Sequence, residues 1–410
     1  MINLSLEWKS CKIGDVVSVR RGASPRPIKD YVSETGVPWV KIADATSDQT
    51  RFLKSTKEFI KEEGVKSSVT VYPGDLIVSN SATPGLPKFM KIKACVHDGW
   101  LVFDDYDGIL KEYLYYYFIV VRDRLVNQAN GSVFKNLKTD IVRDFDIDLP
   151  PLETQAKIVK ILSTIDEKIE KNIEINHNLD TILNSIFKEQ FINNFSPENE
   201  KLIFKKIGDL PLIITDYVAN GSFASLKENV SILDEEDYAY FIRNTDLKSQ
   251  NFEKYVNKHS YDFLKKSSLF GNEVIISNVG DVGSVFLCPF LDKPMTLGNN
   301  MILVKTKENS TNLNFYLFLL FNSEFGQYLL STVTSGSVQL KFNKTEFKSL
   351  ELFIPKDKYL KEFNNTISPI FEYKTKISDE IKNLNNLRDS LLPKLMSGEI
   401  DVSQINCDLD

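Results

Sequence analysis

The sequence contains few of the residues from which metal and redox sites are built. It has three histidines, His97, His177 and His259, and none of them lies near a second histidine. Its four cysteines are widely separated: Cys11, Cys95, Cys288 and Cys407. The spacing matches neither a metal-binding nor a redox pair. These absences argue against a metal centre, and unpaired, scattered cysteines fit a reducing compartment.

Motifs for catalysis are also absent. There is no Gly-x-x-x-x-Gly-Lys-Ser/Thr phosphate loop and no Gly-x-Gly-x-x-Gly after a predicted strand. The Asn/Asp-Pro-Pro-aromatic run of amino-methyltransferases is missing too. We therefore expect the chain to be no enzyme and to hold no cofactor.

Long hydrophobic runs are a third absence. The longest, Tyr113–Val121 and Phe315–Phe321, are far shorter than the roughly 20 residues that span a bilayer. The first twenty residues lack the basic start and apolar stretch of a signal peptide. We expect a cytoplasmic protein without a membrane partner. With 42% hydrophobic and 26% charged residues in 410, the chain is long enough for two cores.

What the chain does contain is an internal repeat at long range. Several residues recur at a constant offset of 205 positions: Gly131 and Gly336, Pro150 and Pro355, Ile165 and Ile370, Leu179 and Leu384, Ser185 and Ser390. Nearer the start of each copy, Asp75–Asn80 matches Glu273–Asn278. A period of about 200 residues is too long for a solenoid. The sequence therefore predicts a duplicated domain.

Each copy begins with patterns that indicate short strands. Apolar and polar residues alternate in Val37–Ile42 and Tyr238–Arg243, and Gly, Pro and Asn interrupt such runs at short intervals. The aromatic runs Tyr113–Phe118 and Phe315–Leu320 continue with helical spacing and predict one buried helix per copy. An aromatic stripe could instead stack on bases, but unbroken Leu and Phe neighbours favour a core.

A long coiled-coil helix is predicted to end each copy, because apolar residues recur at alternating spacings of four and three. The first seam is Ile158, Leu162, Ile165, Ile169, Asn172, Asn176, Leu179, Leu183 and Ile186. The second is Phe363, Ile367, Ile370, Lys374, Ile377, Ile381, Leu384, Arg388 and Leu391. Matching frames predict that the helices pack antiparallel on each other. The polar Asn172 and Asn176 would favour one register, although a polar seam residue could also be exposed.

These patterns predict an α+β protein. Two similar, mostly-β domains alternate with two long helices packed as an antiparallel coiled coil, in a pseudo-two-fold internal repeat. The predicted boundaries are 1–150 for the first domain, 151–195 for the first helix, 196–354 for the second domain, 355–400 for the second helix and 401–410 for the tail.

The pattern resembles the specificity (S) subunit of type I restriction-modification systems. The residues that carry the resemblance are Lys12–Asp15, Val37–Asp44, Gly74–Ile77, Asn130–Ser132, Asp148–Ile158 and Arg388–Ile400. Each motif alone is weak, but the order of domain, helix, domain and helix is distinctive and covers essentially the whole chain. The second copy departs from the pattern, since Ile354-Pro355-Lys356-Asp357 replaces the Leu-Pro-Pro-Leu form of the first.

The resemblance implies a non-catalytic reader of double-stranded DNA. Residues 1–150 and 196–354 would be target recognition domains, each reading one half of a bipartite, asymmetric sequence. The helices would set the gap and dock two methyltransferase (M) subunits, through which restriction (R) subunits join. S-adenosylmethionine, ATP and Mg would belong to those partners. The alternatives are a stand-alone DNA-modifying enzyme, which the missing motifs oppose, and a coiled-coil scaffold that binds proteins only, which the basic loops oppose.

The net charge of −6 argues against DNA binding by the whole surface, because phosphate contacts need Lys and Arg. Basic residues nevertheless cluster locally. The basic candidates are Arg20, Arg21, Arg26, Lys29, Lys88, Lys91, Lys135, Lys341 and Lys344. The candidates for base contacts are Ser79, Asn80, Ser81, Thr83, Arg243, Asn244, Ser277 and Asn278. Because Ser79-Asn80 recurs as Ser277-Asn278, a structural turn is the slightly favoured alternative for these four residues.

Overall fold

The computed structural model describes residues 8–48, 50–128, 136–194, 200–336 and 339–403. The chain forms two compact units. Unit 1 comprises residues 1–175 and 377–410, and unit 2 comprises residues 176–376. This division cuts through the long helices and not at the predicted boundaries 150 and 354. The reason is packing: Ile158 and Leu392 share one core, whereas Leu183 and Phe363 share the other.

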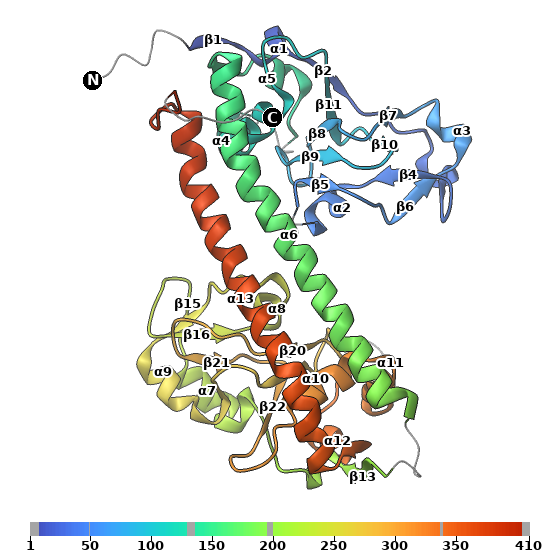
Figure 1. Cartoon of the computed structure of the whole chain (residues 1–410), viewed down its shortest axis with the longest axis vertical. Helices are drawn as coiled ribbons and strands as arrows, with labels where there is room; N and C mark the ends of the chain where they lie inside the picture. The colour runs from blue at the N-terminus through green and yellow to red at the C-terminus, as the bar shows by residue number, and fades with distance from the viewer. Residues whose placement is uncertain (1–7, 49, 129–135, 195–199, 337–338, 404–410) are drawn as a thin grey trace. The chain divides into compact units, whose positions relative to one another are not determined.

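Unit 1 contains two five-stranded sheets and a two-stranded ribbon (Figure 1). The first sheet has the order β3 (Val32–Ser33), β6 (Glu58–Ile60), β4 (Val37–Val40), β10 (Ala94–Val96) and β7 (Val69–Val71). The second has the order β2 (Ser18–Arg21), β11 (Trp100–Asp104), β8 (Leu76–Ser79), β9 (Pro87–Met90) and β5 (Phe52–Leu53). β1 (Lys9–Lys12) pairs with β12 (Asp146–Leu149). Its shorter helices are α1 (Ile13–Val16), α2 (Ile42–Ser47), α3 (Glu62–Val65), α4 (Lys111–Gln128) and α5 (Thr139–Arg143).

Unit 2 repeats this topology with one strand fewer. Its five-stranded sheet has the order β15 (Ile232–Leu233), β17 (Tyr255–Val256), β16 (Ala239–Ile242), β21 (Met295–Leu297) and β18 (Ser268–Leu269). Its four-stranded sheet has the order β14 (Leu212–Asp216), β22 (Met301–Thr306), β19 (Val274–Ser277) and β20 (Val285–Leu287). β13 (Leu202–Lys206) pairs with β23 (Glu351–Pro355). Its shorter α-helices are α7 (Phe223–Asn229), α8 (Asn244–Ser249), α9 (Lys258–Phe263), α10 (Asn314–Asn322), α11 (Glu324–Val333) and α12 (Lys344–Ser349). Among the strands of the described residues, only β5 has no counterpart in unit 2, so the predicted duplication is confirmed.

The aromatic runs lie in core helices. Every residue of Tyr113–Phe118 in α4 is buried, which excludes a stacking platform for bases. The second run, Phe315–Leu320, lies in α10, but its continuation through Leu329 is a separate helix, α11, and not part of one helix as predicted. Ser323 ends α10 and caps α11, because its Oγ accepts a hydrogen bond from the Gly326 amide at 3.2 Å.

The long helices are α6 (Leu152–Gln190) and α13 (Asp357–Met396), which run side by side (Figure 1). Asp166, Asn172 and Asp180 of α6 bind Arg388, Glu380 and Lys374 of α13, respectively. The numbers rise in one helix as they fall in the other, so the predicted antiparallel pairing is confirmed. All seam residues predicted from the heptads are buried or half-buried. Asn172 is fully buried and donates to Glu380 Oε2 at 2.9 Å.

Candidate nucleic-acid interface

Each unit carries the same turn after its central strand. We name these the Ser-Asn turns, Ser79–Leu86 after β8 and Ser277–Ser284 after β19. In the first, the Gly85 amide donates to the Ser79 carbonyl at 2.7 Å, and in the second the Gly283 amide donates to Ser277 at 3.1 Å. Ala82 and Gly280 occupy the same position and both have positive φ, 55° and 78°. The backbone of the turn is therefore the same in both copies.

An asparagine holds each turn against a neighbouring segment, which is the chain after the core helix in unit 2 and the loop between β10 and β11 in unit 1. Asn278 Nδ2 donates to the Phe342 carbonyl at 2.8 Å, and Asn80 Nδ2 donates to the Asp98 carbonyl at 3.0 Å. The Leu137 amide binds the Asn80 carbonyl at 2.8 Å, just as Phe342 binds Asn278 at 3.1 Å. Leu137 and Phe342 are separated by the repeat offset of 205.

The core helices also bind the turns. Arg122 Nε donates to the Pro84 carbonyl at 3.0 Å, and its counterpart Gln327 donates to the Gly283 carbonyl at 2.8 Å. Ser79 and Ser277 are 0% exposed. The geometry therefore favours a structural role for Ser79, Asn80, Ser277 and Asn278, which was the alternative to contact with bases. Ser81 and Thr83, in contrast, are half-buried within the first turn and remain candidates.

In unit 1 the arginines gather beside the Ser-Asn turn around one carboxylate, Asp98. Arg21 Nε donates to the Asp98 carbonyl at 2.7 Å, and Arg21 Nη2 lies 3.7 Å from Asp98 Oδ2. Arg26 Nη2 lies 3.6 Å from the same oxygen, and Ser24 Oγ donates to Oδ1 at 2.7 Å. The Ser24 hydrogen bond, with the charge of Arg21, lowers the pKa of Asp98. The sequence analysis did not select Asp98, which lies next to His97 in the loop between β10 and β11.

These arginines are available to another anion. Arg26 has 80% of its side chain exposed, and exposed ion pairs contribute little to stability. A phosphate could therefore replace Asp98 as their partner at small cost. Arg20 binds Asp104 (Nε to Oδ2, 2.5 Å) and Lys29 is exposed after the loop. Lys91 is exposed too, with its ammonium 4.0 Å from the centre of the Phe52 ring.

Unit 2 places different residues at the same turn. Asn244 Nδ2 donates to Ser277 Oγ at 3.3 Å and to Asp281 Oδ2 at 3.1 Å. Lys248 Nζ and Ser284 Oγ bind Asp281 at 2.7 and 2.6 Å. These hydrogen bonds, that from Lys248 above all, lower the pKa of Asp281 to about 2. Asp281 was not among the selected residues, and an acid inside the repeated turn was the signal that could have found it.

The other candidates of unit 2 are tied to neighbouring acids or to the backbone. Arg243 binds Asp246, with its Nη2 2.5 Å from Oδ1. Lys344 Nζ binds Asp216 Oδ1 at 2.8 Å. Lys341 is exposed, and its backbone pairs with Ser335 beside the second Ser-Asn turn. In unit 1, the candidate Lys135 lies outside the described residues.

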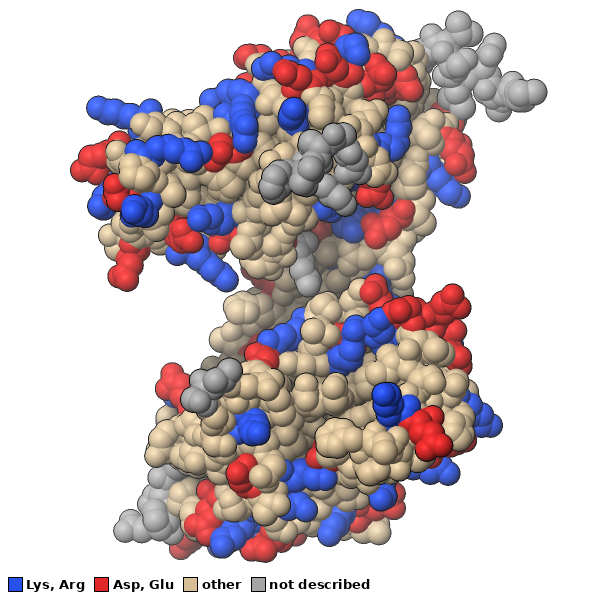
Figure 2. Space-filling view, turned by 180° about the vertical axis from the view of Figure 1, so that it is seen from behind, with Lys and Arg blue, Asp and Glu red and all other residues tan. Residues whose placement is uncertain are grey.

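Charges of both signs are mixed on the surface. Figure 2 shows Lys and Arg interspersed with Asp and Glu on the visible face of each unit. This mixture agrees with the net charge of −6. Binding to a polyanion would therefore depend on local groups such as those around Asp98, and not on a broad basic face.

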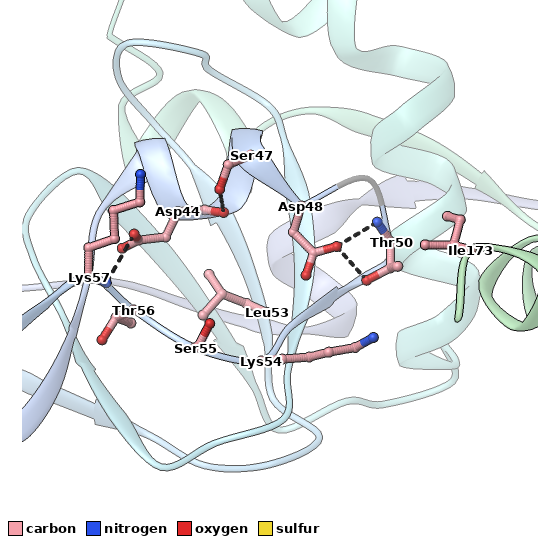
Figure 3. A pocket seen from close by; sticks show the side chains of 10 residues that line it. All are labelled: Asp44, Ser47, Asp48, Thr50, Leu53, Lys54, Ser55, Thr56, Lys57 and Ile173. Carbon is pink, nitrogen blue, oxygen red and sulfur yellow. Dashed lines mark hydrogen bonds between the residues drawn. The ribbon is translucent and has the colours of Figure 1, made fainter. Parts of the chain in front are cut away.

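A hollow of about 450 Å³ in unit 1 lies next to α2 (Figure 3). Its carboxylates are already used by the fold. Asp44 Oδ2 accepts the Lys41 amide at 2.9 Å, and Asp48 Oδ1 accepts the amide and hydroxyl of Thr50 at 2.8 and 2.7 Å. We find no arrangement of acid, base and nucleophile among the residues that line it.

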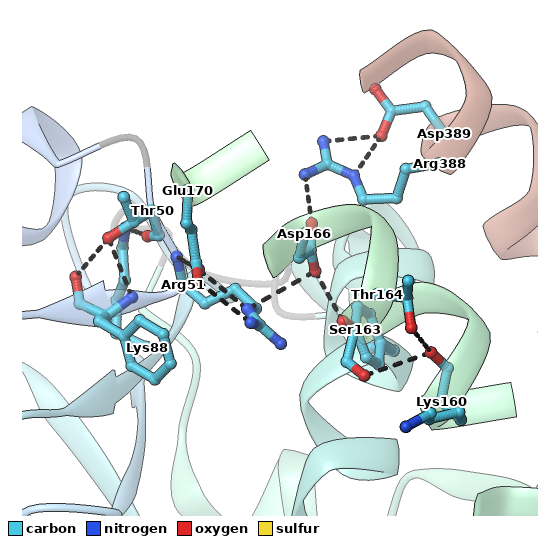
Figure 4. Close-up of polar contacts among 12 residues, drawn as sticks. Thr50, Arg51, Lys88, Lys160, Ser163, Thr164, Asp166, Glu170, Arg388 and Asp389 are labelled. Carbon is cyan, nitrogen blue, oxygen red and sulfur yellow. Dashed lines mark hydrogen bonds and ion pairs between the residues drawn. The ribbon is translucent and has the colours of Figure 1, made fainter. Parts of the chain in front are cut away.

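Lys88 requires a correction, because it is only 4% exposed. Its ammonium donates to the carbonyls of Asp48 at 2.6 Å and Thr50 at 2.5 Å, as Figure 4 shows for Thr50. Burial lowers its pKa. Lys88 therefore supports the segment before β5 and is not placed to contact a phosphate.

Two further observations concern the part of the chain that the structure describes. No group of three or more His, Cys, Asp or Glu residues is arranged there to hold a metal ion. No helix among these residues is long and apolar enough to cross a membrane.

The sequence and fold match known proteins along nearly the whole chain. The family model for the type I restriction modification DNA specificity domain matches residues 5–180 and 252–386. The type I restriction enzyme MjaIX specificity subunit of Methanocaldococcus jannaschii is 26% identical over 433 aligned residues, with 97% of this chain and 95% of that protein covered. The HindI specificity subunit of Haemophilus influenzae is 21% identical, with coverage of 96% and 100%. The solved S subunit from M. genitalium superposes with a TM-score of 0.58 at 12% identity, covering 96% and 97% of the two chains.

Proposed function

We propose, because this chain belongs to the type I restriction-modification DNA specificity family, that it reads a bipartite, asymmetric sequence in double-stranded DNA. Unit 1 would read one half of the target and unit 2 the other. The observation that carries the proposal is the pair of Ser-Asn turns. Their backbones are the same, but the side chains around them differ: arginines around Asp98 in unit 1, and Asn244 and Lys248 around Asp281 in unit 2. One backbone turn with two different sets of side chains is suited to the recognition of two different DNA sequences.

The candidate residues divide by chemistry. Arg20, Arg21, Arg26, Lys29 and Lys91, with Lys341 and Lys344, would contact phosphates, which position a protein on DNA without reading sequence. Ser81, Thr83, Asn244 and Arg243 offer hydrogen bonds to base edges. Arg243 would have to leave Asp246 to do so.

We also propose that the helices dock two methyltransferase subunits. Ile182 of α6 and Leu387 of α13 are separated by the repeat offset, and they are 46% and 47% exposed. An outward apolar residue at the same place on each helix offers the same contact twice, as two copies of one partner require. Restriction subunits would join through the methyltransferase. S-adenosylmethionine, ATP and Mg would be bound by these partners, so the chain alone would neither methylate nor cleave DNA.

A domain exchange tests the two-reader proposal. Residues 1–150 are replaced by the first domain of another family member, and the methylated motif of the host genome is read by long-read sequencing. One half of the motif should change, while the other half and the gap stay the same, because each unit has its own core. A change in both halves would contradict the proposal. Methyl transfer by the purified chain alone would instead support the stand-alone enzyme.

Matched insertions test whether the helices set the gap. One heptad added near Asn176 and one near Ile381 keep the seam in frame and lengthen each helix by about 10 Å. At about 3.4 Å per base pair, the gap in the methylated motif should grow by roughly three base pairs, and neither half should change. Modification that continues at the original gap would show that the helices do not set it.

A further inference from the structure

Each unit presents an exposed aromatic side chain at the end of its central strand opposite the Ser-Asn turn. We name these the aromatic turns, Tyr72–Asp75 before β8 and Phe270–Glu273 before β19. Tyr72 is 54% exposed and Phe270 is 64% exposed. Among the described residues from 8 to 150, Tyr72 is the only exposed large hydrophobic side chain. Its counterpart in the repeat is exposed as well.

The two turns share one backbone. Gly74 and Asn272 occupy the same position with positive φ, 94° and 63°, and their amides bind the carbonyls of Met90 and Cys288, each at 2.8 Å. The acid that closes each turn also corresponds. Asp75 accepts the Tyr72 amide at 2.7 Å, and Glu273 accepts the Phe270 amide at 2.9 Å. These hydrogen bonds account for the backbone conformation of the turns but not for the exposure of the aromatic rings.

Each ring is held by a lysine from a different part of the fold. The Lys93 ammonium lies 5.9 Å from the centre of the Tyr72 ring, and the Lys305 ammonium lies 5.1 Å from that of Phe270. Such cation–π contacts are attractive and favour one position of the ring. A rigid exposed aromatic side chain loses little conformational entropy on binding, which is typical of interface anchors.

Charges of both signs edge the two turns. In unit 1, Lys111 Nζ donates to the Gly74 carbonyl at 3.0 Å, and Asp75 closes the same turn. In unit 2, Glu273 and Glu308 line a hollow of about 400 Å³ together with Ile213 and Lys305. Carboxylates repel the phosphates of DNA. The aromatic turns therefore fit a protein partner that offers an apolar contact and charges of both signs.

We propose that the aromatic turns are a second docking surface for the methyltransferase, one turn for each of its two copies. This inference rests on the proposed function. Side chains that read two different words should differ between the units, as they do at the Ser-Asn turns. An exposed side chain that recurs in both units, and that packs in neither core, is expected to contact a partner that is present in two copies.

Binding of the methyltransferase to the full chain tests the inference. Tyr72→Ser and Phe270→Ser are made singly and together, and binding is followed by isothermal titration calorimetry with purified methyltransferase subunit. Loss of an aromatic anchor of this kind weakens binding by about tenfold. Each single variant should therefore weaken one of two binding steps about tenfold, and the double variant should weaken both. Tyr72→Phe should bind like the natural chain.

A matched control is Phe223→Ser. Phe223 is 82% exposed and follows β14 at the Ser-Asn end of unit 2, so its loss should change methyltransferase affinity less than about twofold. Wild-type affinity in the double variant would overturn this inference alone, because the domain exchange tests the reading of DNA separately. A change in the self-association of the variants, seen by sedimentation without partner, would assign the turns to a second copy of the chain and overturn it as well. A natural chain that binds no methyltransferase would overturn both proposals.

Discussion

In unit 1, a cluster of buried ion pairs joins the long helices to the rest of the unit, whereas in unit 2 aromatic rings do so. Asp166 of α6 is 3% exposed and lies at the centre of the charged cluster (Figure 4). It accepts hydrogen bonds from Arg388 Nη1 at 3.0 Å and Tyr116 Oη at 2.6 Å, and Arg51 Nε lies 3.8 Å away. Arg51 also binds Glu170, with Nε 2.9 Å from Oε1.

The corresponding positions in unit 2 are apolar. At the repeat offset of 205, Asp166 corresponds to Phe371 and Arg388 to Leu183. Phe371 stacks on Phe315 with ring centres 4.3 Å apart and planes inclined by 7°, and Leu183 is fully buried. The fold therefore accepts either buried charged side chains or apolar side chains at these positions. The charged version coincides with the extra strand β5, which begins immediately after Arg51.

The first and largest expected effect comes from breaking the charged cluster. Asp166→Ala removes the buried carboxylate that Arg388 and Arg51 share and leaves them only Asp389 and Glu170 as partners, which costs up to about 3 kcal/mol. The tryptophans, Trp8, Trp39 and Trp100, all belong to unit 1, so urea unfolding followed by their fluorescence reports this unit. We expect a lower midpoint at an unchanged slope.

A double substitution sharpens the comparison by giving unit 1 the chemistry of unit 2. Asp166→Phe with Arg388→Leu removes both charges and introduces the apolar side chains of unit 2, and replacing a buried ion pair with hydrophobic residues is often neutral or stabilising. The double variant should unfold at a higher urea concentration than Asp166→Ala. A double variant as unstable as the single one would show that the two units do not use equivalent sites.

The fold could be predicted from sequence where periodicity was strong. The heptads predicted the antiparallel helices. The break at Ser323 was missed because a serine between Phe321 and Phe325 does not interrupt apolar spacing, although it can cap a helix. α13 also continues through Pro369, a residue that usually disrupts a helix interior.

The candidate site was less predictable, because it depends on burial and partners that sequence does not show. Lys88 has the same local pattern as the exposed Lys91, yet Thr50 and Asp48 draw its ammonium inward. Asp98 contacts two arginines that are distant in the sequence: Arg26 is 72 residues before it and Arg21 is 77 residues before it. No spacing rule connects such residues before the sheets are assembled.

The second expected effect concerns the arginines of unit 1. Arg20, Arg21 and Arg26 replaced together by alanine should weaken DNA binding by the assembled complex. They should also flatten the slope of log affinity against log salt by up to about 2.7, since each phosphate contact contributes about 0.9. Lys341→Ala with Lys344→Ala in unit 2 should flatten it by up to about 1.8. Lys93→Ala, at the aromatic turn, is the control and should leave it unchanged. An unchanged slope in the triple variant would place the arginine loop away from DNA.

The third effect should be equal in the two units. Asn80→Ala and Asn278→Ala each remove a side-chain amide that holds a Ser-Asn turn, at a cost of about 1–2 kcal/mol. The methylated motif should not change in either variant. Ser81→Ala, at a half-buried site, should cost less than about 0.5 kcal/mol but alter the motif if Ser81 contacts a base. A new motif from Asn80→Ala, without loss of stability, would reverse these roles.

The smallest effect distinguishes the units by pH. His97 follows β10, and the residue that follows the equivalent strand β21 is Gly298, so only unit 1 can titrate here. The Gly99 amide donates to His97 Nδ1 at 2.8 Å, which requires that nitrogen to be unprotonated. Burial lowers the pKa of His97 below 6.5, although the charge of Asp98 opposes this and those of Lys41 and Arg21 support it.

The sign follows from proton binding. Between the lowered pKa and 6.5 the unfolded chain binds more protons than the folded chain, so the stability of unit 1 should fall as the pH falls through this window. Asp98 does not contribute there, because its pKa is lowered from 3.8 and its effect appears only in stronger acid. His97→Asn can keep an acceptor for the Gly99 amide but has no proton to gain. Tryptophan-detected unfolding at pH 7.5 and 5.5 should therefore show a smaller difference in this variant than in the natural chain. An equal difference in both would mean that the loss of stability in acid arises elsewhere in unit 1, and that the Asp98 loop keeps its structure when His97 is charged.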